Sequence, residues 1–367
     1  MTPSPRETLL TTFANGHAGR PAWFADLSYW HSAHTRLGDL EPRWAGDGIA
    51  QLHREMGCGL YLAPTEPFRI VFDCDSEQRV EPPHTITIHH TPHGDLREVI
   101  TDIPEALTWD HTEHLLKSEA DLPALQWLVE HMRYEPDIEA IEHRLAITGD
   151  LGVPVVCAPR SPLARLFVVW AGIEAASLAL FAEPDAMRHL LETLDAKDDA
   201  AYELCRRAPS PLVMIPDNLS ADVWGSAFFR QHAGKVYRRR AAELRAAGKF
   251  VVTHLDGRMR GLIGAVAETG ISGIEGLTPT PLGDLAVDQL RDATVEPGTV
   301  LWGGIPGLMF TPHWSDGDFD AAVRRAIETF AADPRTVLGV GDQVPPDGLL
   351  SRVRHVGALL AEICGKS

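Results

Sequence analysis

The chain has 367 residues, of which 44% are hydrophobic and 23% are charged, so it can bury one large core or two medium ones. Its net charge of −18 argues against nucleic acid as a partner, because a phosphate backbone is bound by a basic surface. The sequence shows no signal-peptide core near its start, no run of ~20 apolar residues that would span a membrane, and no CxxC pair among its five cysteines. We therefore expect a cytoplasmic protein with reduced thiols.

Short apolar, β-branched segments alternate with helical segments along most of the chain. After an N-terminal helix, strands are expected at 21–30, 58–64, 153–159, 211–218, 249–254, 270–277, 299–305 and 335–342. The helices expected between them include 43–57, 171–206 and 226–248. Strands that alternate with helices of this length indicate a parallel sheet, and eight of them close a (β/α)8 barrel, the TIM barrel. We expect one barrel domain over residues 1–367.

Residues 68–100, between the second and third strands, alternate apolar and polar side chains. A period of two is typical of strands, so we expect a β-hairpin inserted over one mouth of the barrel. Helices are expected after it at 104–116 and 121–133. No repeat or low-complexity tract marks a domain boundary.

Polar residues stand where several of the expected strands end, which is where barrel enzymes carry their chemistry. Four of them are potential metal ligands on three strands: His254, Asp256, Glu275 and Asp342. One imidazole and three carboxylates suit zinc, manganese or ferrous iron better than copper(I). A structural interpretation is also open, in which Asp256 caps the next helix and Glu275 pairs with Arg258.

Other strand ends offer candidates for substrate binding. The first strand carries Asp26, Tyr29 and Trp30 and is followed by His31, and aromatic walls there would suit an apolar substrate. Core packing explains Trp30 equally well. Asp217 and Asn218 end the fourth strand and either orient substrate or cap the next helix.

The segments "RPAWFADLSYW", "THLDGRM", "IEGLTPTPLGDL", "LWGGIP" and "GVGDQVPPDGLL" together resemble the uroporphyrinogen decarboxylase superfamily along nearly the whole chain. The resemblance implies a (β/α)8 fold and a homodimer. True uroporphyrinogen decarboxylases carry arginines in the first strand-loop to hold substrate carboxylates, whereas this chain has Asp26 there. A tetrapyrrole substrate is therefore not expected.

The chain is also similar to the corrinoid-dependent methyltransferases of this superfamily, which bind zinc through His-x-Cys, a Glu and a second Cys. His254 and Glu275 match that pattern, and Asp256 and Asp342 stand at its two cysteine positions. Carboxylates in place of thiolates leave a metal harder and more Lewis-acidic, which favours an oxygen-linked substrate. The resemblance implies a divalent metal, zinc first, and a methyl group that passes between the substrate and a corrinoid.

The corrinoid would arrive on a separate partner protein, since the chain has no Asp-x-His-x-x-Gly loop. Asp217 or Tyr29 would protonate the departing oxygen. Two alternatives stay open: a metal-dependent lyase or decarboxylase acting on a small carboxylic acid, and a non-catalytic relative that binds a small ligand.

Overall fold

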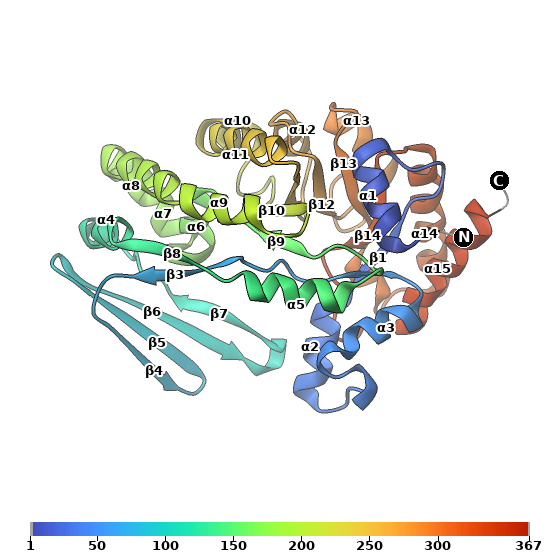
Figure 1. Cartoon of the computed structure of the whole chain (residues 1–367), viewed down its shortest axis with the longest axis horizontal. Coiled ribbons are helices and arrows are strands. Elements are labelled where there is room, and N and C mark those ends of the chain that lie inside the picture. Colours follow the sequence, from blue (N-terminus) through green and yellow to red (C-terminus); the bar gives the residue numbers. More distant parts are fainter. Residues whose placement is uncertain (1–2, 366–367) are drawn as a thin grey trace. The chain divides into compact units, whose positions relative to one another are not determined.

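The computed structural model describes residues 3–365, which form two compact units. The first, called the barrel unit, contains the described residues up to Glu66, Ile138–Cys157, and the described residues from Ala208 onward. The second, called the insert unit, contains Pro67–Asp137 and Ala158–Arg207. Figure 1 shows the elements of each, coloured along the sequence. The assignment of residues 1–367 to a single domain stays a prediction.

The barrel unit contains one sheet of eight strands, each parallel to its neighbours, in the order β2-β1-β14-β13-β12-β11-β10-β9. The strands are β1 (Trp23–Asp26), β2 (Gly59–Tyr61), β9 (Val155–Cys157), β10 (Leu212–Leu219), β11 (Phe250–Leu255), β12 (Gly273–Leu277), β13 (Val300–Pro306) and β14 (Thr336–Gly341). Each overlaps the segment predicted for it. The eight parallel strands expected from the sequence are thus confirmed.

Thr65, which follows β2, joins the two edge strands of this sheet. Its amide donates to the carbonyl of Val155 at 2.9 Å, and the Cys157 amide donates to the Thr65 carbonyl at 2.8 Å. These bonds form a parallel bridge between Thr65 and Val156. The first and last strands of the order are therefore linked, and the sheet is barrel-like.

Buried aromatic rings hold the core of the barrel unit together. The Trp302 ring on β13 lies 5.5 Å from the Phe24 ring on β1 and 5.0 Å from the Tyr61 ring on β2, measured between centroids. Phe13 reaches the same indole from the N-terminal helix, at 6.4 Å. Because a barrel's parallel strands are covered on both faces, they are near-continuous apolar runs, which made them visible in the sequence.

Ten α-helices of the described chain belong to the barrel unit: α1 (Pro5–Asn15), α2 (Ser28–Leu37), α3 (Ile49–Met56), α5 (Ile138–Thr148), α10 (Ser226–His232), α11 (Gly234–Ala246), α12 (Leu262–Ala267), α13 (Leu290–Thr294), α14 (Asp316–Ala332) and α15 (Leu350–Cys364). The first begins with a capping box, in which the Ser4 hydroxyl accepts from the Glu7 amide at 3.2 Å and the Glu7 carboxylate accepts from the Ser4 amide at 2.8 Å. Within residues 3–365, no helix combines the length and the apolar character that crossing a membrane requires.

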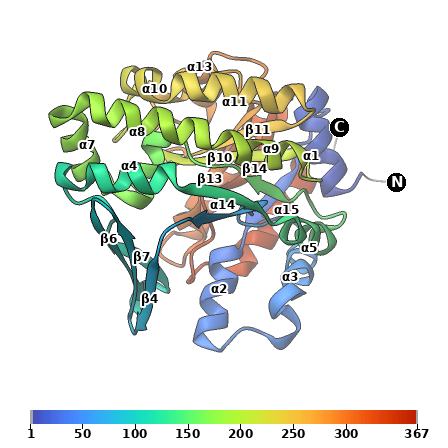
Figure 2. The same cartoon turned by 60° about the vertical axis from the view of Figure 1, so that its left-hand side comes forward.

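The insert unit contains two antiparallel sheets. One pairs β3 (Phe68–Phe72) with β8 (Met132–Pro136). The other has four strands, which lie side by side in Figures 1 and 2: β4 (Ser76–Glu81), β5 (His84–Thr91), β6 (Gly94–Ile103) and β7 (Thr108–Glu113). The helices of this unit are α4 (Leu122–Glu130), α6 (Pro162–Arg165), α7 (Gly172–Ala182), α8 (Pro184–Lys197) and α9 (Asp199–Arg207).

The insertion is larger than the hairpin expected over 68–100, because β7 extends its sheet. The helix expected at 104–116 is wrong: residues 108–113 bond along β6, and a backbone paired in a sheet has no amides left for helical bonds. The helix expected at 121–133 is α4, which ends at Glu130 before β8 begins. The single helix expected over 171–206 is three helices in the structure, and Pro184 opens the second of them.

A buried ion pair fixes the interior of the insert unit. The Arg165 guanidinium donates to both carboxylate oxygens of Asp198, at 3.0 and 2.9 Å, and the Tyr134 hydroxyl donates to the same carboxylate. The Arg165 and Asp198 side chains are 5% and 2% exposed. A buried pair of this kind is costly to break, since the remaining charge would have no partner.

Candidate functional site

Two of the predicted metal ligands lie on neighbouring strands of the barrel unit. β11 and β12 run in parallel with His254 opposite Glu275 in the register. His254 Nδ1 donates to Glu275 Oε2 at 2.7 Å, and the two side chains are 20% and 5% exposed. Glu275 thus pairs with His254 and not with Arg258, which lies 3.7 Å from Asp222.

Gly276 makes room for the His254 imidazole. Its φ is +83°, and a Cβ atom built at this position would lie 2.6 Å from His254 Cε1. Any L-residue at 276 would therefore strain the backbone and displace the ring. The glycine of "IEGL" is required by the position of the histidine.

The other two predicted ligands gather around the same ring. Asp342 follows β14 in a left-handed conformation (φ 65°), and its Oδ1 is 3.9 Å from His254 Nε2. Asp256 Oδ1 accepts from the Thr278 hydroxyl at 2.9 Å and from the Gly257 amide at 2.6 Å. The charge of Asp256 also acts on the pKa values of His254 and Asp342. We call His254, Asp256, Glu275 and Asp342 the carboxyl-end cluster.

The protonation equilibria of the cluster reflect crowded negative charge. Burial of the His254 ring opposes its protonation, but the carboxylates of Glu275, Asp342 and Asp256 outweigh burial and raise its pKa to about 9. Partial burial raises the pKa of Asp342, the charges of Asp256 and Glu275 raise it further, and His254 lowers it. One imidazole faces three carboxylates, so a cation would offset the excess negative charge.

Asp26, at the end of β1, adds a fourth carboxyl group beside this cluster. Its oxygens accept from the Ser28 amide at 2.8 Å and from Gln343 Nε2 at 3.1 Å. Burial raises its pKa to about 6, although the bonds from Ser28 and Gln343 act in the opposite direction and the charge of Glu275 adds to the rise. Near neutral pH a fraction of Asp26 therefore keeps its proton.

Tyr61, Thr278 and Gln343 belong to this site and were not predicted. Burial raises the pKa of Tyr61 well above its usual range, and the charges of Glu275, Asp26 and Asp342 add to the effect. The rule that locates chemistry at strand ends also covers Tyr61, because it is the last residue of β2. Thr278 follows β12, which carries Glu275, and Gln343 follows Asp342. Both side chains are neutral and polar, so the sequence offered no reason to assign them to a site.

The remaining candidates at the first strand lie in structural contacts. α2 begins at Ser28, so Trp30 and His31 are helical. Trp30 is 8% exposed, donates from Nε1 to the Gly348 carbonyl at 3.1 Å, and packs against the His34 ring at a tilt of 37°. His31 Nε2 lies 2.6 Å from the Trp44 carbonyl and lines a separate hollow of about 340 Å³. Tyr29 is half-buried on the same helix.

Asp217 and Asn218 lie at the end of β10, immediately before its last residue, Leu219. The Asp217 side chain is fully buried, whereas Asn218 is exposed with a φ of 51°. The pairing of β10 with β11 is irregular between Ile215 and Leu219, which turns the two side chains to different environments. Their roles in proton donation and substrate binding stay predictions.

The donor set of the cluster fits a divalent cation, although it is not a finished coordination sphere. Among residues 3–365, no three His, Cys, Asp or Glu side chains already converge as a metal would require. His254 Nδ1 is engaged by Glu275, and its Nε2 faces Asp342. A histidine that donates one ring N–H to a carboxylate is the usual arrangement of a metal-binding imidazole, because the carboxylate orients the ring and raises its basicity.

Comparison with known proteins identifies the fold and no family. No family model matches the chain. A methyltransferase from Methanosarcina mazei has a similar structure, with a TM-score of 0.63 and 14% sequence identity over 98% of this chain and 99% of that one. A phosphoglycerate kinase from an Anaeromyxobacter strain is 34% identical over 100 residues, which are 25% of this chain. The chain spans about a quarter of the length of that curated relative (24%). The structural similarity to the methyltransferase supports the barrel-like fold. At 14% identity it gives no information on the substrate.

Proposed function

We propose that the protein is a metal-dependent methyltransferase that moves a methyl group between a small, oxygen-linked methylated substrate and a corrinoid carried by a separate protein. The carboxyl-end cluster is the observation that carries this proposal. The resemblance of the sequence to corrinoid-dependent methyltransferases and the fold shared with the methyltransferase of Methanosarcina mazei support it.

Within this proposal, His254 Nε2, Asp256 and Asp342 would hold the metal, with zinc as the first choice. Glu275 is the fourth donor predicted from the sequence. Its bond to His254 Nδ1 supports a second role, in which it orients the imidazole and keeps Nε2 available. The bound metal would supply Lewis acidity, which withdraws charge from the substrate's oxygen.

Residues next to the cluster would donate a proton to the oxygen that leaves the substrate. Tyr61, with a pKa far above neutral, holds its proton next to the charged groups, and Asp26, with a pKa of about 6, is protonated in a fraction of the molecules. Either side chain could donate to an oxygen that gains charge as its methyl group leaves. Gln343 would keep Asp26 in place by its bond to Oδ2.

The charge of the site bears on the lyase or decarboxylase alternative. The carboxylate of an organic acid would be repelled by the carboxylates of the site, which are Asp26, Asp256, Glu275 and Asp342. A neutral ether or alcohol derivative meets no such barrier. Methyl transfer from a neutral substrate is therefore favoured over the decarboxylation of an organic acid.

Metal analysis tests the first half of the proposal. The purified protein should bind about one zinc per chain, and His254→Ala should lower the affinity at least about tenfold. His313→Ala is the matched control, because that histidine is 82% exposed and lies outside the cluster. Equal zinc affinity in the parent and in His254→Ala would place the metal elsewhere.

A methyl-transfer assay tests the second half. The zinc-loaded protein is mixed with methoxylated small molecules and a reduced corrinoid protein, and the loss of the cobalt(I) absorbance is followed. Expected is a substrate-dependent loss that His254→Ala abolishes and His313→Ala preserves. If no methylated substrate reacts while an organic acid is consumed with the same dependence on His254, the lyase alternative replaces methyl transfer.

A further inference from the structure

The loop that follows β12 is bonded to the turn that follows β11. This loop, residues 278–284, has the sequence TPTPLGD, and the turn, residues 256–260, contains Asp256. The Asp284 carboxylate accepts from the Met259 amide at 2.8 Å and from the Arg260 amide at 3.2 Å. The Arg260 guanidinium donates to the Asp284 carbonyl at 2.8 Å. The end of the loop therefore holds the turn that carries one of the predicted metal ligands.

Gly283 allows the loop to close on its own first residue. A Cβ atom built on Gly283 would lie 1.9 Å from the Thr278 carbonyl oxygen and 3.1 Å from the Gly257 carbonyl oxygen. Backbone atoms cannot move aside as the end of a side chain can, so this position requires glycine. The Gly283 amide also donates to the Pro279 carbonyl at 3.1 Å. The loop is thus a compact unit that fixes Thr278 against the turn.

Thr278 donates its hydroxyl proton to Asp256. The residue is 5% exposed, and its Oγ1 lies 2.9 Å from Asp256 Oδ1. The Gly276 carbonyl lies 3.0 Å from the same hydroxyl, but a carboxylate is the stronger acceptor of its single proton. A Cβ atom on Gly341, the residue before Asp342, would lie 2.5 Å from Thr278 Oγ1. The end of β14 therefore also leaves space for this hydroxyl.

The two oxygens of Asp256 have different surroundings. Oδ1 accepts from the Thr278 hydroxyl and from the Gly257 amide, and two bonds occupy both lone pairs of a carboxylate oxygen. Among residues 3–365, no donor bonds to Oδ2. Asp256 is therefore arranged to give one oxygen, Oδ2, to a cation and to keep the other for the protein.

We propose that Thr278 determines the metal preference of the carboxyl-end cluster by keeping Asp256 monodentate. Zinc takes four ligands, and a catalytic zinc takes three of them from the protein, so a second oxygen from Asp256 would fill the position that the substrate needs. Manganese prefers six oxygen-rich ligands and gains from that second oxygen. Thr278 is a positioning residue, since it acts through Asp256. The inference rests on the proposed function, because it takes the cluster to be a metal site.

Measurements of zinc and manganese affinity test the proposal without any assay of activity. The full chain competes with a chelator for each metal, and the ratio of the two affinities is compared between variants. Thr278→Val keeps the shape of the side chain but releases a lone pair of Asp256 Oδ1. Its zinc affinity should fall about tenfold, and its manganese affinity should fall less, so the ratio should shift toward manganese several-fold.

Three further variants isolate the hydroxyl group. Thr278→Ser keeps it and should keep the ratio of the parent. Thr278→Ala lacks it and should shift the ratio as the valine variant does, which gives the result even if the valine variant does not fold. Thr280→Val makes the same chemical change at an exposed position of the same loop and should leave both affinities unchanged.

The outcomes separate this proposal from the proposed function. Folded Thr278→Val and Thr278→Ala proteins with the ratio of the parent would overturn the proposal, and so would equal losses for both metals, which would show only a general role in the fold of the loop. A parent that binds zinc with a ratio dependent on Thr278 but transfers no methyl group would support the role of Thr278 and refute the proposed function. A parent without zinc affinity would refute both.

Discussion

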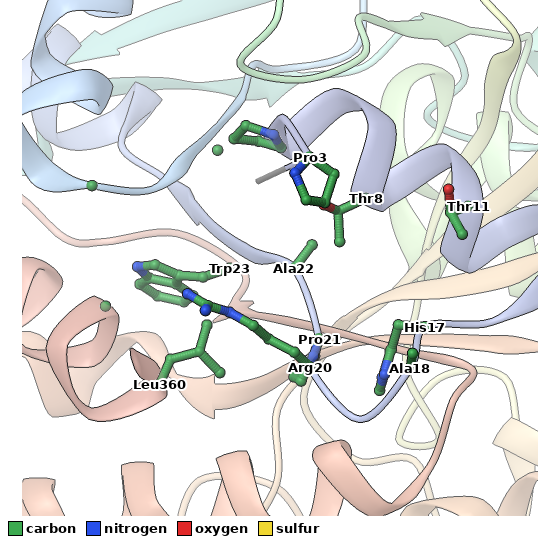
Figure 3. A pocket seen from close by; sticks show the side chains of 14 residues that line it. Pro3, Thr8, Thr11, His17, Ala18, Arg20, Pro21, Ala22, Trp23 and Leu360 are labelled. Atoms are coloured by element: carbon green, nitrogen blue, oxygen red, sulfur yellow. The ribbon is translucent and has the colours of Figure 1, made fainter. Parts of the chain in front are cut away.

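The two ends of the barrel strands carry opposite chemistry, and β1 connects them. At its carboxyl end Asp26 joins a group of carboxylates around His254, where charge is crowded and pKa values rise. At its amino end Trp23 lines a mostly apolar pocket, the amino-end pocket (Figure 3), where His17 is kept neutral and Arg20 is the cation of the lining. A parallel sheet brings all its carboxyl ends to one side, so polar residues that are far apart in the sequence meet there. Helices and loops, by contrast, shape the amino-end pocket.

The largest expected effect is the loss of stability from a substitution at the carboxyl end, at Gly276. Gly276→Ala is expected to lower the free energy of unfolding by roughly 4 kcal/mol, since a left-handed L-residue and a clash with His254 both contribute. Gly261→Ala is the matched control: φ is +78° there, but no atom lies within 4 Å of the added Cβ, so only the backbone cost of about 1–2 kcal/mol remains. Chemical denaturation measures both. Equal losses in the two variants would mean that the His254 ring does not need the space.

The pH dependence of stability should report the buried carboxyl of Asp26. Its folded pKa of about 6 exceeds the unfolded value of about 3.9, so the folded state binds more protons between these values, and stability decreases as pH rises through that window. The difference corresponds to about 3 kcal/mol. Asp26→Asn should remove this loss.

The stabilities of the parent and of Asp26→Asn are compared in metal-free protein, because a bound cation would lower the pKa of Asp26. His53 acts in the opposite direction, since burial lowers its pKa to about 4, and only the difference between parent and variant isolates Asp26. Asp150→Asn, at a 71% exposed side chain, is the control. A parent and an Asp26→Asn variant with parallel stability profiles from pH 4 to 7 would contradict the raised pKa.

Much of the barrel unit could be predicted because each of its strands is marked by a short apolar run in the sequence. Apolar runs located all eight strands, and His254 and Glu275 could be placed together since both stand at the ends of neighbouring strands. Tyr61 was missed because the run "CGLYLAP" is equally well explained by core packing. The sequence leaves Trp30 open between pocket lining and core packing and predicts His31 to line the pocket. It does not show that β1 ends at Asp26 and that α2 turns both side chains toward Gly348 and Trp44.

The insert unit was harder to predict, because long-range pairing decides its structure. Residues 104–116 contain Glu, Ala and Leu, which favour a helix, yet β7 is held by its bonds to β6. The amino-end pocket left no sequence signal, since His17 and Arg20 belong to a loop. The His17 ring is held by Thr336, which is more than 300 residues away in the chain, so the sequence does not show this contact.

Removing the charge of Glu275 tests whether this carboxylate supports metal binding by His254. Glu275→Gln keeps an acceptor for His254 Nδ1–H but loses the charge that holds the pKa of His254 up, so zinc affinity should fall about 10- to 100-fold. Competition with a chelator measures this effect without any assay of activity. Glu268→Gln, which alters an exposed pair with Arg230, is the control. An affinity equal to that of the parent would leave Glu275 without a role in orienting the imidazole.

The smallest expected effect comes from Gly357, which lines the amino-end pocket from the interior of α15. A Cβ at this position would lie 3.5 Å from the Gly57 carbonyl oxygen and 3.9 Å from Trp23 Cδ1, which is ordinary contact. Gly357→Ala should therefore stabilise the protein by about 0.5–1 kcal/mol, because alanine loses less backbone entropy in a helix. The same chemical change thus has opposite signs at the two ends of the barrel: at Gly276 the added methyl group meets a ring that the site requires, and at Gly357 it fills space beside Trp23. Thermal unfolding of the two variants beside the parent measures the contrast, and a Gly357→Ala variant less stable than the parent would show that this wall of the pocket is already closely packed.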